Sequence, residues 1–88
     1  MNRTEAQKAH AKIKQEYPDV IVFLRVDDFM ETYGDDAEIA CKELELAGLP
    51  GICDFPYHAI DRYTARLVQK GFRVAHCNPL PTKRGKGN

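Results

Sequence analysis

One phenylalanine of this chain stands among carboxylates, in the stretch VDDFMETYGDD at residues 26–36. Clustered carboxylates can hold Mg²⁺ for nuclease chemistry. The candidate ligands are Asp27, Asp28 and Glu31, which are close in sequence. No lysine stands close to them in sequence to assist such a site, so we do not expect a metal centre. Two other uses remain for the stretch. The acids could cap a helix, or the ring of Phe29 could be exposed and contact a binding partner.

Helix capping is the more ordinary of these uses. Asp28 and Glu31 are three residues apart, and so are Asp35 and Glu38. That spacing fits a capping box, in which a side-chain oxygen accepts the orphan N–H three residues on. Carboxylates are also stabilised at a helix N-terminus by the macrodipole. Composition alone favours this interpretation, with Phe29 packed under the first helical turn.

Basic residues offer phosphate contacts elsewhere in the chain. Arg62, Arg66 and Lys70 are four residues apart and would form one stripe on a helix. The stripe could contact phosphates, and a solvated outer face explains it equally well. Near the C-terminus, Lys83 and Arg84 could add nonspecific affinity for DNA, or only solubility.

Cysteines and histidines invite a zinc interpretation, from Cys41, Cys53, His76 and Cys77. No C-x₂-C pair is present, and adjacent residues on a strand point to opposite faces. We expect small, buried, reduced cysteines in a cytoplasmic protein. His58 is expected to be structural. No nucleophile–base pair occurs at local spacing, although one assembled from distant residues would not be visible here. We predict neither an enzyme nor a cofactor.

The net charge of zero hides a strong segregation. Residues 1–15 carry four bases against one acid, and residues 55–88 carry seven bases against one acid. Residues 16–54 between them carry eleven acids against two bases. Because local fields govern partner choice more than the sum does, basic ends with an acidic middle could bind nucleic acid or the chain itself.

Alternating elements must position these groups. Helices are predicted over 4–16, 35–46 and 57–70, and strands over 20–26, 52–55 and 72–77. Thr4 is the expected first N-cap, and VIVFLRV is typical of a buried central strand. We predict one α/β domain over residues 1–77, with a small central mixed sheet flanked by helices, and a flexible basic tail over 78–88. No apolar run is long enough to span a membrane.

Two blocks of the sequence resemble the N-terminal mismatch-recognition domain of the MutS family. The first is YPDVIVFLRVDDFMETYGDDAEIACKELEL, and the second is FPYHAIDRYTARLVQKGFRVAHC. In the family, an apolar strand leads into Gly-Asp-Phe-Tyr-Glu, an aromatic residue, an acidic pair and an Ala-rich helix. The second family pattern is Pro-Tyr-His-Ala, a helix and a strand ending near cysteine. The two blocks stand in order and cover roughly residues 16–77.

The resemblance implies a DNA-binding role for Phe29, Met30 and Glu31. Phe29 would enter the minor groove as a wedge beside a mispaired or unpaired base, and Glu31 would hydrogen-bond that base. A wedge unstacks a step and kinks the duplex at a cost of a few kcal/mol. The cost is lower at a mismatch, which is already weakly stacked. The implied partner is therefore double-stranded DNA with mismatches or bulges.

Departures from the family pattern leave a second hypothesis open. Asp27 replaces the family glycine and Met30 its tyrosine, and the segment 47–51 is shorter than in the family. No G-x-x-x-x-G-K-[ST] motif for ATP is present. We expect either a stand-alone single-domain relative or a fragment of a longer protein, without ATP binding in this domain. A protein partner would supply the missing repair functions. The alternative is a protein-interaction or regulatory module that has lost mismatch recognition.

Overall fold

The structure is a computed structural model, and it describes residues 1–77. The predicted tail, with Lys83 and Arg84, lies outside the described residues. The elements are α1 (Arg3–Glu16), β1 (Val20–Val26), β2 (Phe29–Tyr33), α2 (Gly34–Leu44), β3 (Ile52–Pro56), the 3₁₀ turn η1 (Tyr57–Ala59), α3 (Ile60–Gln69) and β4 (Arg73–Cys77). Of the helices in this range, none is long and apolar enough to cross a membrane.

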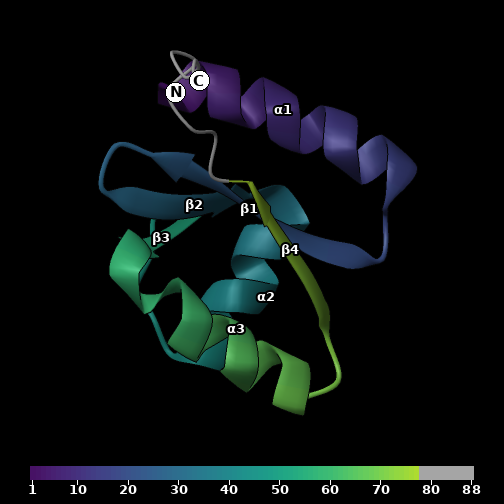
Figure 1. Ribbon diagram of the computed structural model, residues 1–88, viewed down its shortest axis with the longest axis vertical. Coiled ribbons are helices and arrows are strands. Elements are labelled where there is room, and N and C mark those ends of the chain that lie inside the picture. Colours follow the sequence, from purple (N-terminus) through teal and green to yellow (C-terminus); the bar gives the residue numbers. More distant parts are fainter. Residues whose placement is uncertain (78–88) are drawn as a thin grey trace, which may run out of the picture.

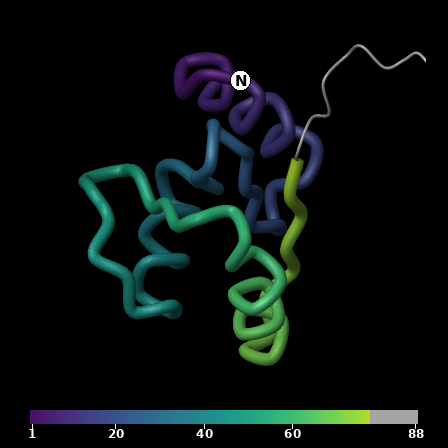
Figure 2. The backbone as a smooth tube through the Cα atoms, turned by 60° about the vertical axis from the view of Figure 1, so that its left-hand side comes forward, coloured from purple at the N-terminus to yellow at the C-terminus, as the bar shows by residue number. Residues whose placement is uncertain are grey.

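The four strands form one mixed sheet in the order β3-β2-β1-β4. β1 pairs antiparallel with β2 and parallel with β4, and β2 pairs antiparallel with β3. Figure 1 shows α1 crossing one face of this sheet, with α2 and α3 on the other. Figure 2 shows α1 and α3 at opposite ends of the molecule, with the strands between them. The predicted α/β class with a small central mixed sheet is confirmed.

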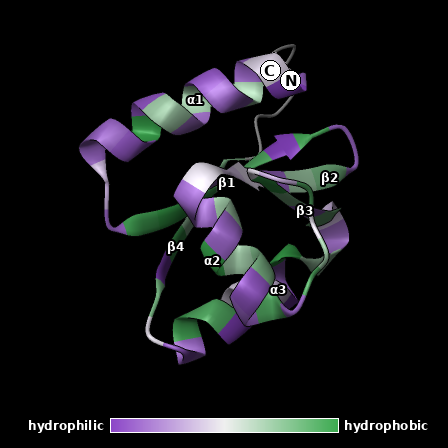
Figure 3. Cartoon of the chain, turned by 180° about the vertical axis from the view of Figure 1, so that it is seen from behind, coloured by the Kyte–Doolittle hydropathy of each residue, from purple (hydrophilic) through white to green (hydrophobic). Residues whose placement is uncertain are grey.

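Both faces of β1 are buried, which explains its continuous apolar run. Val20, Val22 and Leu24 pack in the cluster that includes Ala6 of α1. Ile21 and Phe23, which alternate with them, join the larger core formed with α2, β3 and α3. In Figure 3 hydrophobic colour marks segments of the strands, α2 and α3, whereas α1 is largely hydrophilic. The strand predicted over 20–26 is confirmed.

The sequence analysis missed β2, and both capping predictions around it are wrong. Glu31 lies in the middle of this strand, so Asp28 and Glu31 cannot form a capping box. α2 begins at Gly34 behind Tyr33, and no side-chain capping bond is made there among the described residues. The acidic first turn of α2 still complements the helix dipole. FMETY stands among carboxylates, and only pairing with β1 and β3 reveals it as a strand.

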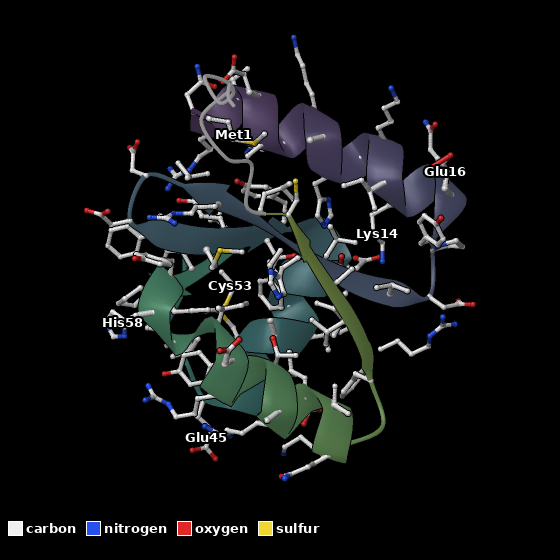
Figure 4. The ribbon with its side chains drawn as sticks, in the orientation of Figure 1. Met1, Lys14, Glu16, Glu45, Cys53 and His58 are labelled. Carbon is white, nitrogen blue, oxygen red and sulfur yellow. A yellow bond between two sulfur atoms is a disulfide. The ribbon has the colours of Figure 1, made fainter. Side chains whose placement is uncertain are left out.

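Helix ends differ in smaller ways from the prediction. Asn2 rather than Thr4 caps α1, because its side chain accepts from the Glu5 backbone N–H and Glu5 accepts from the Asn2 N–H in return. The helix predicted over 57–70 is divided into η1 and α3. His58 of η1 is exposed and lies at the outer edge of the molecule (Figure 4).

A disulfide joins α2 to β3. Cys41 and Cys53 are bonded, with their Cα atoms 5.8 Å apart. The expectation that all three cysteines are unpaired and reduced is therefore wrong for these two, while Cys77 is free and half-buried. Gly48 lies against the bridge with φ +64, and a Cβ there would meet the Cys41 sulfur at 2.5 Å. The loop after α2 therefore needs glycine at this position.

Candidate nucleic-acid interface

The tip of the β1–β2 hairpin presents Phe29 to solvent. A two-residue turn of Asp27 and Asp28 joins Val26 to its register partner Phe29. Phe29 is 43% exposed, although it opens a strand whose other four residues are all buried. Successive side chains of a strand alternate in direction, so Phe29 shares the α1 side of the sheet with Glu31. The ring is therefore not packed under a helical turn.

The turn that carries Phe29 is held by two neighbours. The Arg25 guanidinium lies 3.5 Å from the centroid of the Tyr57 ring, and Arg25 Nε donates to the Asp27 carbonyl at 2.8 Å. The Tyr57 backbone N–H donates to the Asp28 carbonyl at 2.8 Å. Both turn carbonyls are thus engaged, and a cation–π contact ties the hairpin to η1. Phe29 projects from a braced turn.

Asp27 adopts a conformation that favours glycine. Its φ is 54°, in the left-handed region. Aspartate visits this region more readily than most non-glycine residues. The departure from the family glycine is therefore compatible with the backbone, but it places a carboxylate next to Phe29.

Glu31 is buried in a network of three polar side chains. It is 3% exposed. Arg3 of α1 donates from Nε and Nη2 to its two carboxylate oxygens, each at 2.9 Å, and the Tyr33 hydroxyl donates at 2.9 Å. Burial by itself would raise the pKa of Glu31, but the bonds from Arg3 and Tyr33 outweigh it and lower that pKa. Burial and the bond to Glu31 raise the pKa of Tyr33.

A second buried carboxylate anchors α1 to the rest of the domain. Asp36 accepts from Lys14 Nζ at 3.0 Å and from the Val22 backbone N–H at 3.1 Å, and it lies 2.9 Å from His10 Nε2. Figure 4 shows Lys14 reaching from α1 towards the sheet. Burial would raise the pKa of Asp36, but the bonds from these partners lower it. A surface depression of about 380 Å³ borders this network, whose polar groups already bond one another. We assign a structural role to this network around Asp36.

Within residues 1–77, the other residues predicted to bind DNA are not gathered around Phe29 on the surface. Met30 is 1% exposed and belongs to the main core, so it is a core residue rather than a surface one. Arg62 is exposed and Arg66 half-buried on α3, beyond the opposite face of the sheet, and the exposed Lys70 is the C-cap of that helix. Lys70 also pairs with Glu43 at 3.2 Å. Phosphate contact by this stripe stays a prediction, and α3 lies on the other side of the sheet from α1 and Phe29.

Sequence reasoning missed three residues that shape this site: Arg3, Arg25 and Tyr57. Two of them carried a signal, because Tyr57 belongs to the Pro-Tyr-His-Ala block and Arg25 interrupts the apolar run just before the motif. Arg3 carried no signal, since its partner is 28 residues away. Among residues 1–77, no group of three or more histidine, cysteine, aspartate or glutamate side chains is arranged to hold a metal ion.

Comparisons with known proteins agree on one family. Residues 4–87 match the family model described as MutS domain I. A DNA mismatch repair protein MutS from Dehalococcoides mccartyi is 43% identical over 94 residues, which cover 97% of this chain and 11% of that protein. Its namesake from Pelotomaculum thermopropionicum is 47% identical over 81 residues, covering 83% of this chain and 9% of that protein. The protein of that name from Methanosarcina acetivorans is 40% identical over 96 residues, covering 96% and 11%. The chain therefore spans about a tenth of the length of these curated relatives.

Proposed function

Because this chain belongs to the MutS domain I family, we propose that it is a DNA-binding domain that recognises mismatched or bulged duplexes through Phe29. The observation that carries the proposal is the exposure of Phe29 at the tip of a braced hairpin. An exposed apolar ring on a turn that is already fixed can contact a partner without the cost of ordering that turn.

The proposed mechanism is insertion of the ring at a weak base step. A wedge in the minor groove must unstack a step and bend the duplex, which costs a few kcal/mol. A mismatch or bulge is already poorly stacked, so the same insertion costs less there. The contacts of Arg25 and Tyr57 with the turn should favour binding, because the turn that carries the ring need not be ordered when DNA binds. Discrimination then arises from DNA deformability.

Attraction to the phosphates must come from outside the tip, because Asp27 and Asp28 repel them. α1 lies on the same side of the sheet as Phe29 and carries exposed Lys8 and Lys12. We propose that these lysines and the basic C-terminal residues provide a salt-sensitive, sequence-independent attraction. Glu31 is proposed to contact the mispaired base, as the family resemblance implies.

The wider role is proposed by analogy with the relatives, whose name is DNA mismatch repair protein. Mismatched DNA is the proposed ligand, and a protein partner would supply the functions that lie outside this domain. No step in the proposal uses ATP or catalysis.

Phe29→Ala tests the wedge by fluorescence anisotropy with matched, G·T and single-base-bulge duplexes. We expect the variant to lose its preference for the bulge while its melting temperature changes little, because the ring is already 43% exposed. A fully buried phenylalanine would instead cost about 3–5 kcal/mol. Tyr17→Ala is the matched control, since Tyr17 is an exposed aromatic residue at the far end of α1. Retained bulge preference in Phe29→Ala would contradict the wedge.

A second function is favoured by the charge around the ring. Asp27 and Asp28 flank Phe29, and carboxylates beside an exposed aromatic residue suit a basic protein surface better than a phosphate backbone. In that case the domain would be a protein-interaction module. Absence of binding to every duplex at low salt would favour this alternative.

A further inference from the structure

Arg3 closes off the carboxylate proposed to read the base. Its guanidinium makes a bidentate pair with Glu31, and the two side chains differ sharply in exposure, 45% for Arg3 against 4% for Glu31. The guanidinium is therefore the solvent side of the pair. A base approaching from the surface meets Arg3 before it meets Glu31.

The hydrogen bond to a base and the ion pair compete for the same oxygens. Both carboxylate oxygens of Glu31 are occupied by Arg3, and one of them also accepts from Tyr33. We infer that Arg3 is a specificity-determining residue: it neutralises Glu31 while the domain is on matched DNA, and it must be displaced before a mispaired base can bond to that carboxylate. This inference rests on the proposed function and deepens it.

Release of Arg3 is compatible with the fold. Arg3 is the first residue of α1, and its half-exposed side chain can turn into water without disturbing the core. The helix itself is anchored further along, by Ala6 in the core and by His10 and Lys14 at Asp36. The hydroxyl of Tyr33 stays on Glu31, so the carboxylate is never without a donor.

The pair also explains how an acid can be tolerated in a phosphate-lined groove. Paired with Arg3, Glu31 adds no net charge, so matched DNA is not repelled by it. Matched DNA offers no unpaired base to replace the guanidinium, so the pair stays closed. A mispaired base with a free donor can replace the guanidinium on Glu31. The free energy of breaking the Arg3–Glu31 pair is then subtracted from the affinity for mismatched DNA.

The test compares the discrimination factor, the ratio of Kd for matched duplex to Kd for bulged duplex, in four proteins. These are the parent, Arg3→Gln, Glu31→Gln and the double variant, all measured by anisotropy on the full chain. Arg3→Gln should raise the factor by about tenfold, because Glu31 is then free for the base and repelled by matched DNA. Glu31→Gln should lower it. In the double variant the factor should equal that of Glu31→Gln, since Arg3 acts only through Glu31.

Lys12→Gln is the matched control, because it removes the same charge from an exposed position of α1. It should weaken both duplexes alike and leave the factor unchanged. A factor that Arg3→Gln leaves unchanged or lowers, in a protein that is folded at the temperature of the assay, would overturn the inference. The inference would also be overturned if Arg3→Gln changed the discrimination factor by the same ratio in the parent and in Glu31→Gln.

Arg3→Lys keeps the test decisive if Arg3→Gln does not fold. Lysine retains the charge but cannot make the bidentate pair, so the factor should rise to an intermediate value. An unchanged factor in Arg3→Lys would count against the inference. Failure of the proposed function is distinct, because the parent protein itself would then show a factor of one.

Discussion

At Glu31, burial and hydrogen bonding act on one carboxyl group in opposite directions. Bonding prevails, so the pKa of Glu31 lies below its ordinary value of 4.5. The pKa of Asp36 is likewise lowered from 3.8 by its partners, against the effect of burial. A carboxyl with a lower pKa in the folded state binds protons more weakly there. Its stabilising contribution is full above the unfolded pKa and is lost as the pH falls through the folded pKa.

We therefore expect the free energy of unfolding to fall as the pH drops below about 4.5, and to be independent of these two groups near pH 7. Urea titrations between pH 3 and pH 7 measure this dependence. Glu31→Gln should flatten the part of the curve that belongs to Glu31, while Glu16→Gln, at the exposed end of α1, should not. An identical acid dependence in Glu31→Gln would show that the Arg3 pair contributes nothing to stability.

At the scale of elements, the turn of the β1–β2 hairpin has Asp27 in the left-handed region and its carboxylate beside Phe29. Asp27→Gly should relieve the positive φ of 54° and remove a carboxylate beside Phe29. We expect stability to rise by up to about 1 kcal/mol, and affinity for matched and bulged duplexes to rise together. Asp28→Asn removes the neighbouring charge without relieving that φ, so it should raise affinity only. Thermal melts and anisotropy separate the two effects, and a less stable Asp27→Gly would contradict the expected relief.

The bridge between α2 and β3 closes a short loop. Cys41 and Cys53 are 12 residues apart in sequence, and closing a loop of this size stabilises a fold by about 3 kcal/mol in the chain-entropy model. We expect Cys53→Ser, or dithiothreitol, to lower the urea midpoint accordingly. Reductant should have no further effect on Cys53→Ser, and Cys77→Ser should behave as the parent. A parent protein indifferent to reductant would contradict a stabilising bridge.

The elements that the sequence predicted correctly are those whose signal is local. β1 has a continuous apolar run. α1 is rich in helix-forming residues, and α3 has apolar residues at helical spacing. β2 is different, because its five residues become a strand only through partners on both sides. The exposure of Phe29 depends on that pairing, and so does the burial of Glu31. The Cys41–Cys53 bridge and the Arg3–Glu31 pair also join distant residues, so no local pattern could indicate them.

At the scale of the whole molecule, the two sides of the sheet carry different charged surfaces. Phe29 and α1 share one side, whereas Arg62 of α3 and Lys70, the C-cap of that helix, lie beyond the other. A duplex seated on Phe29 can reach the lysines of α1 but is directed away from α3. If the duplex lies on Phe29, the phosphate contacts predicted for Arg62, Arg66 and Lys70 should be absent, and binding data can test this.

Salt dependence measures which basic groups touch DNA. The slope of log Kd against log salt concentration should fall by about 0.9 for each phosphate that the protein no longer neutralises. We expect this for Lys8→Gln and Lys12→Gln on α1. A chain ending at Pro81, which lacks Lys83, Arg84 and Lys86, should also show a smaller slope, with matched and bulged duplexes weakened alike.

Lys70→Gln provides the contrast, because Lys70 already pairs with Glu43 and lies beyond the opposite face of the sheet. Its slope should equal that of the parent. If Lys70→Gln lowers the slope and the α1 variants do not, the duplex lies against α3 instead. Phe29 would then face away from the DNA, and the protein-interaction alternative would account better for its exposure.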